Sequence, residues 1–181
     1  MIINEMTQEE CISTLARLGF GRLACARDNQ PYVVPLNFAY ENGHLYIFSK
    51  AGQKVEWMRK NPSVCVEVDE ITSHCQWLSV VAFGHYEELP ETPDHESERN
   101  LAYKVLQERA MWWHTTAVGS PRRRRTAESL KPFYHRIHID RVTGHRAVPD
   151  AAEGAAMAAS EAAHNKRTSW VSRLLQRTRI I

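Results

Sequence analysis

Residues 31–69 carry the feature that most restricts the fold: a β-hairpin signal followed by a short helix and another strand. The apolar segments Tyr32–Tyr40 and Leu45–Ser49 flank an Asn42-Gly43 pair. Asn and Gly tolerate the positive φ angles of a tight turn, so this pattern predicts an antiparallel hairpin. At least part of the core is therefore built from antiparallel strands.

A short polar loop follows the hairpin and carries Ser49 and Lys54. The spacing predicts a two-turn helix over Gln53–Lys60, ended by Asn61-Pro62. A phosphate group is well held by a hydroxyl, an ammonium and the free amides of a helix start. The sequence therefore predicts a phosphate site at the mouth of the hairpin.

The remaining segments complete an α+β pattern that is mainly β. Thr7 and Glu10 form a capping box for a helix that ends at Gly19. Further segments predict strands over residues 21–26, 63–69, 77–86 and 133–142, and a helix over about 96–113. Six β-segments with two or three flanking helices predict a six-stranded antiparallel barrel. A β-sandwich would fit the same segments, whereas the spacing does not suit a doubly wound fold.

The chain of 181 residues predicts one domain with an appendage. We expect the domain to cover residues 1–147. Residues 148–181 read as an alanine-rich linker and a short basic amphipathic tail, which could be a frayed helix or a docking peptide. Residues 151–181 hold five basic and two acidic side chains, a net charge of +3.

Two negative features bear on location. No apolar run approaches the ~18 residues of a membrane span, and the N-terminus does not look like a secretory signal. The four cysteines are scattered and form no C-x-x-C pair, which favours reduced thiols. These features predict a cytoplasmic protein.

The histidines do not predict a metal site. His135 and His138 lie three apart on a predicted strand and therefore face opposite sides. His44, His85 and His114 are isolated in the sequence, and no pair has zinc-ligand spacing.

The run Arg122–Arg125 raises an alternative from another class, binding to nucleic-acid phosphates. No aromatic residues interleave the arginines, and no helix-turn-helix or zinc pattern accompanies them. A solvated loop is the favoured interpretation, and nucleic acid is not the expected partner.

The order of several motifs resembles the pyridoxamine 5′-phosphate oxidase-related family, in particular its FMN-binding split-barrel branch with the nitroimidazole-resistance proteins. The motifs are Gly19–Ala24, Gln30–Tyr40, Leu45–Ser49, Gly52–Lys54 and Asn61-Pro62. The resemblance covers roughly residues 5–145. It implies a homodimer with FMN at the subunit interface and a small-molecule substrate.

The resemblance also implies which residues hold the cofactor. Strand residues would lie along the flavin ring, and the loop after the hairpin would meet the phosphate. The residues are Val34, Pro35, Leu36, Asn37, Phe48, Ser49, Gln53 and Lys54.

The implied function is that of an FMN-dependent oxidoreductase in which the flavin performs the redox chemistry. The oxidase proper has Arg-Lys where this chain has Gln53-Lys54, and some nitroimidazole-resistance-type members have a histidine at Phe48. These departures leave the substrate and the catalytic residues open. The alternatives are a flavin-binding module without turnover and, because related split barrels bind it through one axial histidine, a haem-binding module.

Overall fold

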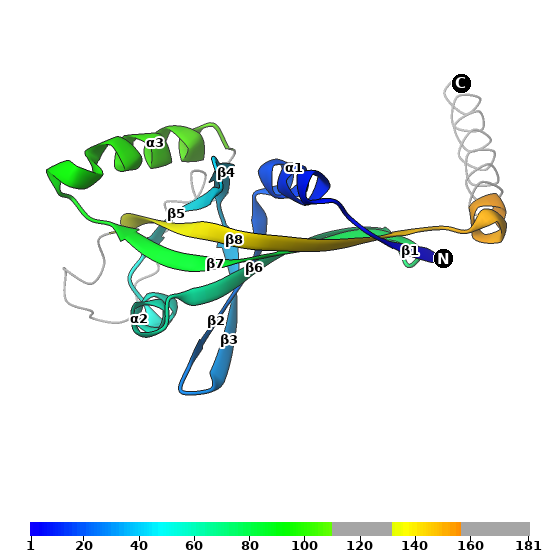
Figure 1. Cartoon of the computed structure of the whole chain (residues 1–181), viewed down its shortest axis with the longest axis horizontal. Coiled ribbons are helices and arrows are strands. Elements are labelled where there is room, and N and C mark those ends of the chain that lie inside the picture. Colours follow the sequence, from blue (N-terminus) through cyan, green and yellow to red (C-terminus); the bar gives the residue numbers. More distant parts are fainter. Residues whose placement is uncertain (110–131, 157–181) are drawn as a thin grey trace, which may run out of the picture.

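The structure, a computed structural model, describes residues 1–109 and 132–156 and consists mainly of one antiparallel sheet (Figure 1). The strands run in the order β3-β2-β6-β7-β8-β5-β4, and β1 pairs with β8. Their bounds are β1 (Ile2–Glu5), β2 (Phe20–Arg27), β3 (Gln30–Asn37), β4 (Ala39–Glu41), β5 (His44–Lys50), β6 (Ser63–Ser73), β7 (Gln76–Leu89) and β8 (Pro132–Val148).

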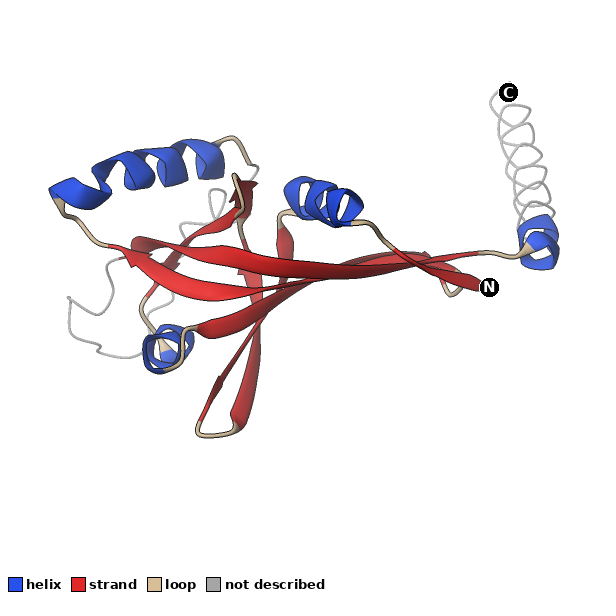
Figure 2. Ribbon diagram, in the orientation of Figure 1, coloured by secondary structure: helices blue, strands red, loops and turns tan. Residues whose placement is uncertain are grey.

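Three helices flank the sheet (Figure 2). They are α1 (Gln8–Leu18), α2 (Gln53–Lys60) and α3 (Glu96–Gln107); a 3₁₀ turn, η1 (Pro93–His95), precedes α3, and residues 151–156 form a further short helix. No helix among the described residues is long and apolar enough to cross a membrane.

The sheet does not close, and this openness is what a split barrel requires. β3 pairs only with β2, and β5 pairs with β4 only over His44–Tyr46. The edges of β3 and of Ile47–Lys50 are therefore open in the described part of the chain. The predicted mainly β fold with a split antiparallel barrel is confirmed.

The strand count differs from the predicted six, because the described part of the chain contains eight strands. The expected strand over Tyr32–Tyr40 is broken at Phe38, whose N–H donates to the Gly19 carbonyl (2.9 Å) and whose side chain is fully buried. β1 was not predicted, because its four residues are all exposed and their sequence does not alternate between apolar and polar side chains. Helix α3 ends earlier than expected, at Gln107.

Two apolar cores hold the sheet and helices together. The larger one fills the barrel and receives α1 and α2; its fully buried members include Leu15, Leu23, Phe38, Leu45, Ile47, Val55, Met58, Val66, Val68, Val80 and Ile137. The smaller core lies between α3 and the other face of β5; it contains Ala39, Tyr46, Leu89, Ala102, Val105 and Leu106. Alternate residues of β5 thus face two different cores, which fixes its register.

Local signals at the turns are confirmed. The Thr7 hydroxyl accepts from the Glu10 amide, and the Glu10 carboxylate accepts from the Thr7 amide. Asn42 and Gly43 adopt φ angles of 48° and 77°, as the hairpin turn requires. Gly19, with φ 65°, ends α1 in the left-handed region.

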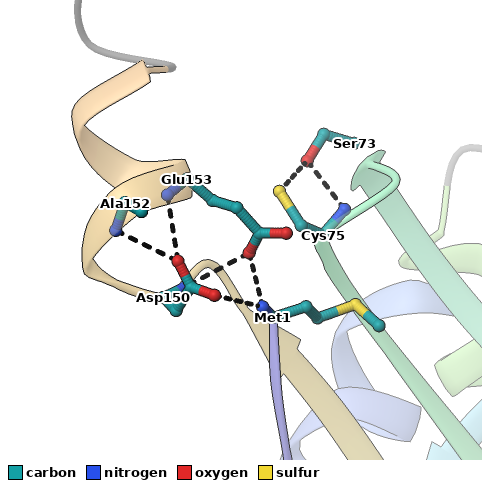
Figure 3. Close-up of polar contacts among 6 residues, drawn as sticks. All are labelled: Met1, Ser73, Cys75, Asp150, Ala152 and Glu153. Carbon is teal, nitrogen blue, oxygen red and sulfur yellow. Dashed lines mark hydrogen bonds and ion pairs between the residues drawn. The ribbon is translucent and has the colours of Figure 1, made fainter.

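The start of the chain is fastened to the segment after β8 (Figure 3). The Met1 ammonium lies 2.9 Å from the Asp150 carboxylate and 2.6 Å from that of Glu153. Asp150 also accepts from the amides of Ala152 and Glu153, so it caps the short helix. The predicted domain boundary after residue 147 stays a prediction.

Several sequence predictions lie outside the described residues. They concern the last residues of the helix expected over about 96–113, the run Arg122–Arg125 and the basic tail from residue 157 onward.

Candidate functional site

The Lys54 ammonium stands out among the charged groups of the barrel because it is removed in part from solvent and has no acidic partner among the described residues. It lies in the first turn of α2, half-buried, close to Cys25 and His135. Burial lowers the pKa of the Lys54 ammonium, and no carboxylate among the described residues pairs with it. A desolvated cation without a partner is costly, and an anion bound beside it would remove that cost.

The helix that carries Lys54 begins without a side-chain cap. Its N-cap is Gly52, which makes no capping hydrogen bond, so the first-turn amides are available to a ligand. Ser49 lies just before the loop, and its hydroxyl makes only a 3.5 Å contact with the Lys50 carbonyl. Gln53 is exposed at the same helix start. The predicted phosphate-binding residues Ser49, Gln53 and Lys54 therefore lie in one short stretch of chain, at the end of β5 and the start of α2, next to the unpaired edge of Ile47–Lys50; we call the space between this edge and the edge of β3 the opening of the barrel.

The open edge of β3 forms the other border of this opening. Val34 and Leu36 pack toward the barrel core, whereas Pro35 is exposed. Because N–H and C=O groups of alternate residues point to the same side, Pro35 and Asn37 direct their backbone toward the unpaired edge. The backbone of Val33 points to the same edge, because Val33 lies two residues before Pro35. Val33 and Asn37 thus offer amide donors there, while Pro35 offers only a carbonyl.

Phe48 lies differently from the other predicted site residues. Its ring packs on Tyr134, with centroids 4.8 Å apart, in the core beneath α3. Only its backbone can face the opening. Ser49, the next residue, alternates to the barrel side.

A cavity of about 550 Å³ adjoins the Asn37 end of β3. It lies between the C-terminal ends of α1 and α3 and the β4 strand; its lining includes Arg17, Phe20, Asn37, Tyr40, Glu41 and Arg109. The Arg109 guanidinium donates to the carbonyls of Ala16 and Arg17 at the end of α1. Sequence reasoning missed this cavity because its walls come from three stretches of chain that are far apart in the sequence.

His135 was also missed as part of the site. Its ring is fully buried, and neither nitrogen has a hydrogen-bond partner within residues 1–109 and 132–156. It lies between Tyr86 and Phe133, with ring centroids 5.3 Å and 5.4 Å away. Burial, together with the nearby Lys54 charge, lowers the pKa of His135 to about 3, so the ring is neutral. Alternation with the buried Ile137 is the sequence signal that could have found it.

Comparison with known proteins identifies the family. Residues 7–146 match the family described as pyridoxamine 5′-phosphate oxidase. The chain belongs to this family. The family resemblance drawn from the motif order is therefore confirmed.

Two relatives match this chain over nearly their whole length. An uncharacterized protein of Rhizobium meliloti (strain 1021) is 38% identical over 147 residues, which cover 81% of this chain and 97% of that protein. A solved structure of an FAD-binding protein from Mesorhizobium loti is 41% identical, with a TM-score of 0.66, covering 82% of this chain and 99% of that one.

A more distant solved structure shares the fold. It is described as a candidate 5-nitroimidazole antibiotic resistance protein from Bacteroides thetaiotaomicron, at 21% identity and a TM-score of 0.56. It covers 81% of this chain and 89% of its own.

Proposed function

We propose that this oxidase-family member binds a flavin nucleotide in the opening between β3 and β5 and is an FMN-dependent oxidoreductase. The observation that carries the proposal is the half-buried Lys54 ammonium, which has no acidic partner among the described residues. The flavin 5′-phosphate would lie against Lys54, the Ser49 hydroxyl and the first amides of α2. Gln53 would add a neutral donor where the oxidase proper has an arginine.

The ring of the flavin would lie along β3. The amides of Val33 and Asn37 are donors for its carbonyl oxygens, and Val34, Pro35 and Leu36 supply the apolar wall. A bound flavin supplies hydride or electron transfer; this chain binds it, orients it and excludes water. The cavity beside Asn37 is large enough for a small-molecule substrate next to the ring.

FMN and FAD share the phosphate that Lys54 would hold. The Mesorhizobium loti relative is named as FAD-binding. We propose FMN because every predicted contact lies within the ring and the first phosphate. FAD would need further residues that bind its second phosphate and its adenine.

The proposal includes a homodimer that completes the site. The outward side of the sheet next to the opening exposes apolar side chains, with Val33 58% and Phe20 52% exposed. Phe83 lies on the same side, partly exposed, with the Arg141 guanidinium 3.7 Å from its ring centroid. A second copy packed on this surface would bury these groups and close the open edge of β3.

The test begins with an absorption spectrum of the purified protein and mass identification of what it releases on denaturation. FMN and FAD are then titrated into the emptied protein. We expect Lys54→Ala to weaken FMN binding by roughly tenfold to a hundredfold, since a charged hydrogen bond is worth about 1.5–3 kcal/mol.

The matched control is Lys60→Ala, at the exposed far end of the same helix, which should leave affinity unchanged. Equal affinity of wild type and Lys54→Ala would overturn the phosphate assignment. Flavin that binds but is never reduced by a nicotinamide would support the alternative of a non-catalytic binding module. A Soret band would support haem instead.

A further inference from the structure

Three histidines that are distant in sequence form one row across the sheet. His44 on β5 lies opposite His138 on β8, and His138 lies opposite His85 on β7. The sequence interpretation treated His44 and His85 as isolated, which was wrong because strand register brings them together. The side chains of His85 and His138 are 53% and 50% exposed.

The His44–His138 pair has the geometry of a chelate. The Ile139 amide donates to the Gly43 carbonyl (2.9 Å), which makes His44 and His138 a non-hydrogen-bonded pair, the kind with the closest side chains. The His44 Nε2 and His138 Nδ1 atoms are 3.3 Å apart. Two imidazole nitrogens bound tetrahedrally to one metal ion at 2.0–2.1 Å are separated by about 3.3–3.4 Å.

The second nitrogen of the His44 ring is held by a hydrogen bond, whereas that of His138 faces a carboxylate beyond hydrogen-bond distance. His44 Nδ1 lies 2.9 Å from the Asn42 carbonyl, which can only accept, so Nδ1 carries the proton and Nε2 keeps its lone pair. His138 Nε2 lies 3.9 Å from Asp140 Oδ1. A carboxylate behind a ligating imidazole is the usual outer support of a metal site.

A β-bulge aims Asp140 at this row. Gly84 pairs with Ile139 and Phe83 with Arg141, so Asp140 is the extra residue on β8. A Cβ atom on Gly84 would lie 2.0 Å from the His138 carbonyl oxygen, so only glycine permits this approach. The bulge places the Asp140 carboxylate 2.6 Å from His85 Nδ1 as well.

We propose that His44 and His138 chelate a divalent transition-metal ion, with Asp140 as the outer-shell support. No group of three or more His, Cys, Asp or Glu side chains among the described residues is arranged to hold a metal ion. The site is therefore a two-imidazole chelate whose other coordination positions are open to water or a small ligand. Imidazole selects Ni²⁺, Cu²⁺ and Zn²⁺ over Mg²⁺ and Ca²⁺.

Metal binding changes which ring nitrogen of His138 carries the proton. Without metal, His138 Nδ1–H donates to His44 Nε2. Upon binding, Nδ1 gives up its proton and Nε2 gains one, facing Asp140. Two neutral imidazoles then bind the cation with no net proton release.

The experiment is calorimetric titration of NiCl₂ and ZnCl₂ into the untagged protein in a non-coordinating buffer, with MgCl₂ as the selectivity control. We expect a Ni²⁺ site that is lost in His44→Gln/His138→Gln. Asp140→Asn should weaken it by about tenfold, within the range for outer-shell partners. His145→Gln, an exposed histidine elsewhere on β8, should bind like wild type.

Thermal melts without metal show whether each variant folds. Ni²⁺ binding to a folded double variant with wild-type affinity would overturn the proposal, and so would equal binding of Mg²⁺. The test does not depend on flavin binding, because the emptied and flavin-loaded proteins can both be titrated.

Discussion

The outer surface of the protein and the opening of the barrel differ in whether positively charged side chains have acidic partners among the described residues. On the surface, Arg17 lies 2.6 Å from Glu70 and Arg59 lies 2.5 Å from Glu88. In the opening, Lys54 is half-buried and has no acidic partner among the described residues. Exposed arginines are matched within the chain, although water alone would satisfy them. The ammonium that most needs a partner has none among the described residues, which is why we propose a ligand as its counter-ion.

The largest expected effect is on the stability that bound FMN adds to the protein. This added stability should depend on Lys54 in the opening and not on the surface arginines. FMN at 100 times its Kd should stabilise the wild-type protein by about 2.7 kcal/mol. Lys54→Met should lose most of that gain while its flavin-free form is at least as stable as wild type, since a desolvated charge is removed. Urea unfolding with and without FMN measures both quantities. A flavin-free variant that is clearly less stable would show that Lys54 has a partner within the fold.

The next prediction concerns His135 beneath Lys54. Its folded-state pKa of about 3 is below the ordinary value of ~6.5, so the unfolded chain binds the extra proton first. The stability is fully present above pH ~6.5 and is lost as the pH falls toward 3. The loss from this group by pH 5 is about 2 kcal/mol. Urea unfolding at pH 7 and pH 5 measures it, and His135→Leu should remove that part of the pH dependence.

The smallest expected effect belongs to the surface. Arg59→Gln removes an ion pair with Glu88 in which the Arg59 side chain is half exposed. The free energy of unfolding should fall by no more than about 1 kcal/mol, and FMN affinity should not change. A fall in FMN affinity comparable to that of Lys54→Ala would contradict the proposal that Lys54 in the opening, and not the surface arginines, binds the ligand. Fluorescence titration with FMN decides this.

The local parts of the fold were predictable because their causes lie within a few residues. The Thr7–Glu10 capping box, the Asn42-Gly43 turn and the α2 helix that presents Lys54 each depend on neighbours in the chain. The proposed phosphate site was predictable for the same reason, since Ser49, Gln53 and Lys54 lie within six consecutive residues, and its role in binding stays a prediction.

What the sequence could not reveal depends on pairings across the sheet. The break at Phe38 follows from its bond to Gly19, and the neutral His135 follows from burial between β5 and β7. The cavity beside Asn37 needs α1 and α3 together.

The sequence by itself determined the family and the antiparallel hairpin, and it predicted a loop that could hold a phosphate, because these are contiguous patterns of residue type. Only the tertiary structure decided which polar groups lack partners and which histidines meet. His44 and His138 are 94 residues apart, and strand register alone places their nitrogens 3.3 Å from each other. Register is set by packing of both cores, which no local window of sequence contains.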